Sequence, residues 1–540
     1  MESDKYMTTG PVNLPPDPSR VIEGLRDTGY TFNTAIADVI DNSITHGNAS
    51  KISVGIDMDL DGKILVTIAD NGIGMELEKL INAMKYGSQA LDDPLSLGKF
   101  GLGLKTASTA YCRRLSVLTR PKGGNEYLKA VWDLDHIAEV NAWKLLMEDP
   151  SAADLQYLNG VSEDSGTVVI WEKVDRAIKE YQSPTGSAAR RALTKLKERL
   201  EFHISLVYQK YLDPNVSEWS TLSIDLNGNA IHAWDPFCTA EEDTELLAED
   251  KQPVYDENDN SVGEFTIKAY ALPNKFSFSS VEARQNARLG NSMQGFYIYR
   301  HGRLIHNGSW LGLFTQEPHG SLHRVEFCFD HNLDEAFQLD IKKSRILLNE
   351  GIASWLKNEF LPAPRRAADK KYRKGKRSEI TASTAGIHDS SNSLIASRES
   401  EVSGSKVEVV DMKRGEAMVT NRYGESKIKL TISEAENPSE LFVKPVESID
   451  DGLLWEPGII DSNKAVLINT GHIYYERVYL PNKNDGVIVQ GVDSLLWALC
   501  EAEMSTINDK TQRYFRELRF EVSRVLRNLI EELPEGEIED

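Results

Sequence analysis

Apolar residues in the first third of the chain repeat at intervals that predict a mixture of helices and strands. From Ile36 to Ile44 they fall on one stripe at helical spacing, so Thr31–His46 is expected to be an amphipathic helix. Lys51–Asp57 and Lys63–Ala69 are β-rich runs joined by Asp61-Gly62, which predicts a β-hairpin. The other predicted elements are helices at Met75–Lys85 and Leu104–Tyr111 and strands at Leu115–Thr119, Tyr127–Trp132 and Thr167–Trp171. This order favours an α/β sandwich over a doubly wound fold.

The rest of the chain predicts two further units, so the fold class expected for the whole protein is α+β. After a long helix at Arg190–Tyr211, a second mixed domain is expected, with strands at Phe265–Leu272, Gly295–Arg300 and Val325–Asp330 and a closing helix at Leu347–Leu361. Thr381–Ser405 is rich in Ser, Thr, Ala and Glu, which is typical of a flexible linker. The third unit ends in a strongly helical stretch, Val492–Leu533, and the apolar stripe of Ala502–Leu533 is expected to be core or a dimer surface. The predicted boundaries are 1–20 (N-terminal strap), 21–180, 181–362, 363–405 (basic segment and linker) and 406–540 (smaller mixed α/β domain with an acidic tail).

The overall charge limits the possible partners. The 540 residues carry 83 acids against 61 bases, a net charge of −22, so the chain is not expected to coat nucleic acid through its overall charge. Arg365–Arg377 is a local exception, with eight bases and one acid. No apolar run is long enough to span a bilayer, the N-terminus does not resemble a secretory signal, and the four cysteines are scattered. A cytoplasmic protein with reduced thiols and no membrane contact is expected.

Two short polar segments have residue types suited to binding a ligand. Asp38 and Asn42 lie four apart in a predicted helix, so both side chains project from one face. A carboxylate can orient an attacking water, and an amide oxygen can ligate Mg²⁺. Asp70 ends an apolar strand and is followed by Gly72 and Gly74, which allow the backbone to approach a ligand closely. Taken alone, either segment could instead be an exposed polar helix face or an ordinary strand-to-helix turn.

A third segment, Gly98–Thr106, is rich in glycine and opens a predicted helix, an arrangement that suits phosphate oxygens. It is neither a P-loop nor a dinucleotide-binding fingerprint, because Leu104 separates the last glycine from Lys105-Thr106 and no apolar strand precedes it.

In this order, the three segments resemble the GHKL (Bergerat-fold) ATPases, which include gyrase B, the large heat-shock chaperone of this fold, sensor histidine kinases, MutL and MORC proteins. The resemblance covers about Gly24–Trp171 and implies that ATP and Mg²⁺ bind here. It implies that Asp38 is the general base, Asn42 the Mg²⁺ ligand and Asp70 the residue that reads the adenine amine. The base is usually Glu in hydrolysing members, so Asp38 implies slow turnover.

The same resemblance assigns the remaining site residues. Tyr86–Leu97 corresponds to the ATP lid, and Gly166-Thr167 to the late Gly-Thr pair that supports the adenine-binding Asp. The base pocket would be lined by Gly72, Gly74 and Met75, and the phosphates held by Gly98, Lys99, Phe100, Gly101, Leu102, Gly103, Leu104 and Lys105, with Thr167 also in the ATP site.

The second domain resembles the S5-like transducer domain of MORC-type and MutL-type proteins. The resemblance rests on Gly295–Ile305, Arg324–Asp330 and Leu339–Ser344. It implies that Lys343, or the adjacent Lys342, reaches the γ-phosphate and acts in catalysis. Surface lysines at a strand end are the structural alternative.

These features predict a Mg²⁺-dependent ATPase that forms a homodimer on binding ATP. The expected client is DNA, held by a MORC-like clamp through Arg365–Arg377, with a possible role in genome (antiviral) defence. The alternatives are a chaperone-like remodeller with a protein partner, a nucleotide-binding switch with little turnover, and, with the poorest fit, a histidine kinase.

Overall fold

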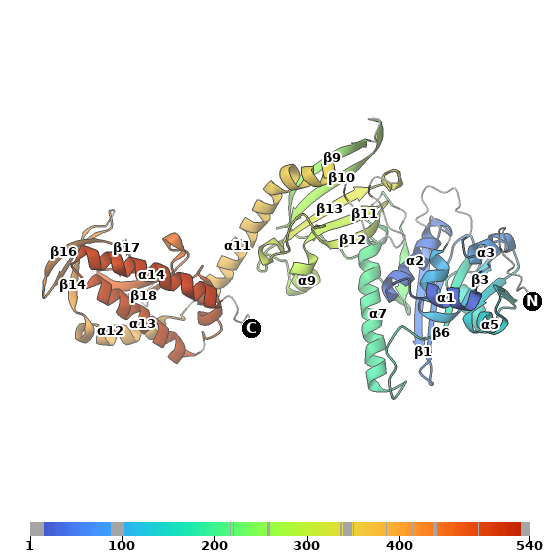
Figure 1. The fold of residues 1–540 in the computed structure, drawn as a ribbon, viewed down its shortest axis with the longest axis horizontal. Helices are drawn as coiled ribbons and strands as arrows, with labels where there is room; N and C mark the ends of the chain where they lie inside the picture. The colour runs from blue at the N-terminus through green and yellow to red at the C-terminus, as the bar shows by residue number, and fades with distance from the viewer. Residues whose placement is uncertain are drawn as a thin grey trace, which may run out of the picture. The chain divides into compact units, whose positions relative to one another are not determined.

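The computed structural model describes residues 16–87, 102–216, 218–219, 221–255, 260–334, 337, 348, 350–384, 386–412, 414–435, 440–483 and 485–530. The chain divides into two compact units, Met1–Asp369 and Lys370–Asp540 (Figure 1). No helix in the described ranges is both long and apolar enough to cross a membrane.

The first unit begins with a mixed sheet whose strand order is β5-β4-β3-β6-β2-β1-β7-β8. Neighbouring strands are antiparallel except β1 and β7, which are parallel. The strands are β1 (Lys51–Met58), β2 (Ile64–Asp70), β3 (Cys112–Arg120), β4 (Leu128–Asp133), β5 (Leu146–Glu148), β6 (Gly166–Val174), β7 (Ser223–Leu226) and β8 (Asn229–Ala230). The predicted β1–β2 hairpin is confirmed. The predicted boundary at residue 180 differs from the structure, because the chain returns to this sheet to pair Lys51–Val54 with Ser223–Leu226.

Helices cover one face of this sheet and share a single core with it, in which Ile36 and Ile40 are fully buried. The helices that contribute are α1 (Pro18–Leu25), α2 (Phe32–Thr45), α3 (Leu77–Met84), α4 (Gly103–Thr109), α5 (Leu134–Val140), α7 (Ser187–Val207) and α8 (Gln209–Leu212). Thr31 begins α2 with a capping box, in which its hydroxyl accepts from the Thr34 amide. The predicted α/β sandwich is therefore confirmed.

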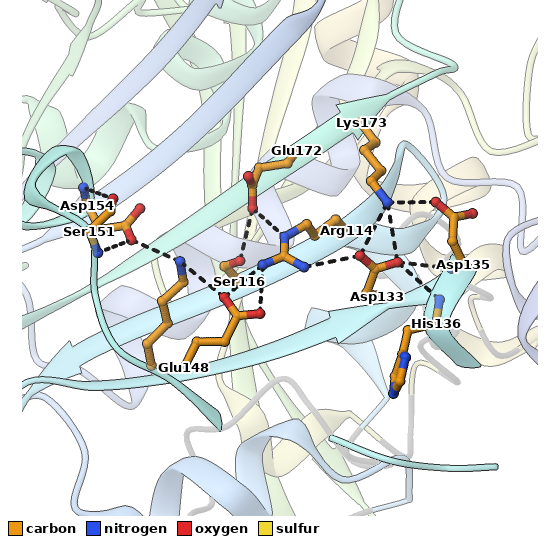
Figure 2. A network of polar contacts seen from close by, with 11 residues as sticks. Arg114, Ser116, Asp133, Asp135, His136, Glu148, Ser151, Asp154, Glu172 and Lys173 are labelled. Carbon is orange, nitrogen blue, oxygen red and sulfur yellow. Dashed lines mark hydrogen bonds and ion pairs between the residues drawn. The ribbon is translucent and has the colours of Figure 1, made fainter. Parts of the chain in front are cut away.

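The opposite face of the sheet is partly apolar and partly charged. Leu118 of β3 packs there against Leu158 of α6 (Ala152–Asn159). Because side chains alternate along a strand, Arg114 and Ser116 lie on this face too. Arg114 bonds with Asp133, Glu148 and Glu172, and neighbouring ion pairs join Lys129 to Asp154 and Lys173 to Asp133 and Asp135 (Figure 2). These residues are called the Arg114 network below.

The second sheet of the first unit has the order β12-β11-β13-β10-β9. Its strands are β9 (Glu245–Tyr255), β10 (Ser261–Ala271), β11 (Gly295–Arg300), β12 (Arg303–Ser309) and β13 (His323–Phe329). The three strands predicted here are present, whereas β9 and β12 were not predicted. A short helix, α9 (Val281–Asn286), precedes β11. Helix α10 (Glu350–Trp355) continues into a π-helix, Leu356–Phe360, so the predicted closing helix is confirmed over residues 350–360.

Two helices occupy much of the segment expected to be linker. They are α11 (Pro362–Thr384) and α12 (Asp389–Val402). The prediction of a flexible linker at Thr381–Ser405 is therefore wrong for α12, because Ile387 and Ile395 are buried in the core of the second unit. Tertiary packing overrides the polar composition here.

The second unit contains two sheets and two long C-terminal helices. Its strands are β14 (Ser405–Asp411), β15 (Glu416–Asn421) and β16 (Gly424–Lys429) in one sheet, and β17 (Thr431–Ser433), β18 (Val443–Val446), β19 (Trp455–Ile460) and β20 (Asn463–Asn469) in the other. Helices α13 (Gly486–Met504) and α14 (Asp509–Ile530) pack with α12 over the second of these sheets in one core. The predicted mixed domain with a helical end agrees with this arrangement. His472 is buried and its ring bonds the Ser523 carbonyl.

Candidate nucleotide site

Helix α2 brings the first predicted segment next to the third. Asp38 lies in the middle of α2 and is only 6% exposed. The Tyr30 hydroxyl donates a hydrogen bond to its Oδ2 at 2.9 Å. A Cβ on Gly103, the first residue of α4, would lie 2.8 Å from the same oxygen, so only glycine lets the carboxylate approach this closely. Asn42 is half-buried one turn further along α2.

Asp70 is the buried carboxylate at the end of β2. Its Oδ2 accepts from the Ser43 hydroxyl at 2.8 Å, and its Oδ1 accepts from the Gly72 amide at 2.9 Å. The donors that the structure describes for it are neutral, so burial raises the pKa of Asp70 from 3.8 to about 6. Because Ser43 belongs to α2, the second predicted segment is fastened to the helix that carries Asp38 and Asn42.

Glycines make the loop after β2 possible. A Cβ on Gly72 would lie 2.5 Å from the Gly47 carbonyl oxygen. Gly74 has a φ of +65°, and a Cβ there would lie 2.0 Å from the Arg120 carbonyl oxygen. These close backbone contacts explain why the segment needs glycine at both positions.

Thr119 of β3 joins this loop to β6. Its hydroxyl donates to the Gly166 carbonyl at 3.0 Å, accepts from the Met75 amide at 2.9 Å and lies 3.1 Å from the Thr167 hydroxyl. Thr167 is directly opposite Asp70 in the β2–β6 pairing. The structure therefore brings Asp70, Gly72, Gly74, Met75 and Thr167 together.

The predicted phosphate segment is described only in part. Gly98, Lys99, Phe100 and Gly101 lie outside the described residues, as do residues 88–97 of the predicted lid and both Lys342 and Lys343. Leu102 precedes α4, and Leu104 packs against the core. The Lys105 ammonium donates to the Ala83 carbonyl at 2.8 Å, and burial lowers the pKa of Lys105 to about 8. A phosphate contact by Lys105 stays a prediction.

Several residues of the site were not predicted from the sequence. Ser43 could have been predicted as a site residue, because its hydroxyl directly follows the Asp-Asn pair of the predicted helix. Tyr30 and Thr119 had no such signal, because their roles depend on contacts with α2 and β6. Asp41 was not singled out from the sequence, yet it is buried and ion-paired to Arg303.

The donor set suits a hard cation that brings its own oxygen ligands. The amide of Asn42 and the carboxylate of Asp38 project from the same face of α2, and both offer oxygen. In the described part of the chain, no group of three or more His, Cys, Asp and Glu side chains could hold a metal ion by itself. Mg²⁺ that keeps several water and phosphate ligands fits such a site.

Part of the chain is similar in sequence to known proteins. A family model described as "Histidine kinase-, DNA gyrase B-, and HSP90-like ATPase" matches residues 30–167. The ATPase MORC2B of Mus musculus is 35% identical over 78 residues, which are 14% of this chain and 8% of that protein. A crystal structure of the N-terminal domain of a DNA repair protein covers 66% of this chain and 98% of its own, with a TM-score of 0.39 and 14% identity.

The family match begins at Tyr30 and ends at Thr167, two residues that the structure places in the site. It spans about a quarter of the chain, and the MORC2B match spans a small part of that relative. The domain assignment therefore applies to the N-terminal sandwich. Residues 30–167 are similar in sequence to the histidine kinase-, DNA gyrase B- and HSP90-like (GHKL) ATPases, and a stretch of 78 residues is similar to a MORC ATPase.

Proposed function

We propose that the protein is a Mg²⁺-dependent ATPase. The observation that supports this most is the Ser43–Asp70 hydrogen bond of 2.8 Å, which joins a buried carboxylate to the helix that carries Asp38 and Asn42. A residue suited to reading a base and residues suited to phosphate chemistry are thereby held on one framework. Such fixed geometry is what a hydrolytic site needs.

Each residue is proposed to act by its own chemistry. Asp70 accepts a hydrogen bond from the adenine amine, and Asn42 holds Mg²⁺. Asp38, whose Oδ2 is already oriented by Tyr30, positions the attacking water. Bound Mg²⁺ supplies neutralisation of charge on the phosphates. Gly98–Lys105 as the phosphate cradle and Lys343 as the lysine from the second domain belong to the same proposal.

Phosphate release by the full chain tests the proposal. Asp38→Asn is expected to lower kcat at least about 100-fold while changing the Kd for ATP only a few-fold, because general-base loss acts on the chemical step. Asn42→Ala is expected to raise the Mg²⁺ concentration needed for half-maximal rate. Asp61→Asn, in the exposed β1–β2 turn, is the matched control. ATP binding without hydrolysis in the unsubstituted protein would favour a nucleotide-binding switch.

We propose DNA as the client, through the basic segment. This segment lies on α11, and its exposed Arg366, Lys370 and Arg373 are spaced by four and three residues, so they share one helix face. A row of cations on one face can follow a phosphate backbone. Arg365 does not belong to this row, because its guanidinium lies 3.7 Å from the Phe314 ring centroid.

Salt-dependent DNA binding tests this part of the proposal. Arg366→Glu with Lys370→Glu is expected to weaken binding at least tenfold at low salt and to reduce its salt dependence. Arg191→Glu with Lys195→Glu is the matched control, because these exposed bases have the same spacing on α7. Equal loss in both double variants, or no DNA binding at all, would favour a protein client. The genome-defence role stays a prediction.

We propose that the protein forms a homodimer, and one surface of the second unit supports self-association. In α13, all of which the structure describes, every exposed residue is nonpolar. Val487 and Leu495 are 81% and 60% exposed. The exposed residues of this surface carry no charge that could pair with a charged partner. An apolar surface can instead pack against the same surface of a second copy of the chain. The ATP-dependent approach of the N-terminal domains is the finer part of this proposal.

Analytical ultracentrifugation with and without a non-hydrolysable ATP analogue tests the dimer. Leu495→Asp is expected to raise the dimer dissociation constant at least tenfold, because it places a charge in an apolar contact. Leu60→Asp makes the same change at a 94% exposed position of the β1–β2 turn and is expected to have no effect. A monomer under both conditions would contradict the proposal.

A further inference from the structure

Helix α2 makes a second buried polar contact through Asp41, three residues after Asp38 and directly before Asn42. Asp41 is 3% exposed and lies between Asp38 and Asn42 in the sequence. Its Oδ1 accepts from Arg303 Nε at 2.7 Å and from the Tyr208 hydroxyl at 2.8 Å. The Tyr208 hydroxyl also lies 2.7 Å from the Ala37 carbonyl. Tyr208 belongs to the core of the N-terminal sandwich, whereas Arg303 reaches α2 from outside it.

Arg303 comes from the second sheet, and the local turn aims it. His301 and Gly302 both have positive φ, of +48° and +78°, as a tight β11–β12 hairpin turn requires. A Cβ on Gly302 would lie 2.7 Å from the Trp219 ring, so the turn is packed against this residue. Arg303 is the first residue after the turn, and its guanidinium reaches 262 positions back along the chain.

Helix α8 is bonded to the second sheet at several points. The Tyr211 hydroxyl donates to the His301 carbonyl at 2.6 Å, and the Tyr299 hydroxyl donates to Gln209 at 3.1 Å. Lys210 pairs with Glu326 of β13 at 2.7 Å. The second sheet is therefore joined to α8, while its Arg303 alone among these side chains bonds directly to α2.

A buried ion pair of this kind is strongly destabilising to break. Separation would leave an uncompensated carboxylate and guanidinium away from water. The position of the second sheet and the position of the C-terminal half of α2 are therefore linked, and such linkage acts in both directions. The C-terminal half of α2 carries Asn42 and also Ser43, which donates to Asp70.

We propose that Arg303 is a positioning residue for the nucleotide site: through Asp41 it holds the turn of α2 that presents Asn42 and Ser43. The second domain thereby controls the site with a residue other than the predicted Lys343. This inference rests on the proposed ATPase function. If the ion pair only joined the two domains, its loss would change the amide hydrogen exchange of α2 and the rate of ATP hydrolysis no more than the loss of any other pair between them.

Arg303→Gln, Asp41→Asn and their combination in the full chain test this, with Lys210→Gln as the matched control. Lys210 belongs to a largely buried pair between α8 and the second sheet, and that pair does not include α2. Arg303→Gln is expected to speed amide hydrogen exchange in residues 32–45 of the nucleotide-free protein at least tenfold and to lower kcat at least tenfold. In the double variant the two introduced amide side chains can hydrogen-bond to each other, so partial recovery of both quantities is expected.

The two failures are distinguishable. Loss of the proposed function would appear as no ATP binding by the unsubstituted protein, while the exchange of residues 32–45 would still report on Arg303. Exchange and kcat unchanged in Arg303→Gln, or equally changed in Lys210→Gln, would overturn the positioning role. If Asp41→Asn does not fold, Arg303→Lys, which keeps the charge and loses the Nε donor, gives the same comparison.

Discussion

The two faces of the N-terminal sheet hold their carboxylates in opposite ways. On the helix-covered side, Asp70 is buried among a hydroxyl and backbone amides, and its pKa is raised to about 6. On the other side, the Arg114 network surrounds its carboxylates with cations, and the pKa values of Asp133 and Asp154 are lowered (Figure 2). Burial is the largest single influence on all three pKa values, and it raises each of them. Hydrogen bonds from cations outweigh this effect only in the network.

This difference indicates which carboxylates contribute to stability and which are suited to a ligand. Paired charges satisfy each other, so the network stabilises the fold and offers little to a small molecule. Among the described residues, Asp70 bears a desolvation cost without a cation in return, and a bound amine would offset that cost. A buried carboxylate that is not paired with a cation is typical of a functional site. Four predictions test the comparison.

Asp70→Asn is expected to separate function from stability most clearly. The affinity for ATP should fall at least about 100-fold, because a site built to accept from an amine loses its acceptor. The free energy of unfolding at pH 7.5 should not fall, because the neutral amide avoids the cost of a buried charge. Calorimetric binding and urea unfolding measure the two quantities. Asp154→Asn, in the network, should give the reverse pattern, and a shared pattern would contradict the comparison.

The two regions should respond to pH with opposite sign. Burial raises the pKa of Asp70 from its ordinary value of 3.8 to about 6 in the folded protein, so the stability associated with it is complete below about pH 4 and is lost as the pH rises to about 6. About two pKa units correspond to about 3 kcal/mol. The difference in unfolding free energy between Asp70→Asn and the unsubstituted protein should therefore grow by this amount from pH 4 to pH 7. The lowered pKa values of the network carboxylates act oppositely, because their stability is lost as the pH falls.

Arg114→Met should destabilise the fold and spare the site. Removing the guanidinium leaves Asp133, Glu148 and Glu172 without their shared cation. The Arg114 side chain is 20% exposed. A loss of about 2 kcal/mol in unfolding free energy is expected, somewhat less than for a fully buried pair. The Kd for ATP should change less than twofold. Lys63→Met removes an exposed pair with Asp61 and should cost under about 0.5 kcal/mol.

Ser43→Ala should give the smallest effect and refine the account of Asp70. It removes one neutral hydrogen bond of 2.8 Å and leaves the Gly72 amide in place. About 1 kcal/mol is expected, which is about a five-fold loss of ATP affinity. Ser108→Ala alters another fully buried serine of the same domain and should leave the affinity unchanged. A loss as large as that of Asp70→Asn would mean that Ser43 itself contacts the ligand.

Much of the fold could be predicted from the sequence because its signals are local. The β1–β2 hairpin follows from a turn dipeptide between β-rich runs, and the core stripe of α2 follows from helical spacing. Strands β7 and β8 were missed because four- and two-residue strands have too little pattern, and their place depends on pairing with a distant strand. Helix α12 was missed because its polar composition matches a linker.

The sequence by itself determined the chemistry of the candidate site. Asp38, Asn42, Asp70 and the glycines around Asp70 are set by residue type, spacing and backbone freedom, all of which are local properties. The tertiary structure decided which partner each carboxylate receives: Ser43 for Asp70, Tyr30 for Asp38 and Arg303 for Asp41. These pairings depend on how sheets and helices pack, and burial then determines whether a charge is paired for stability or left for a ligand.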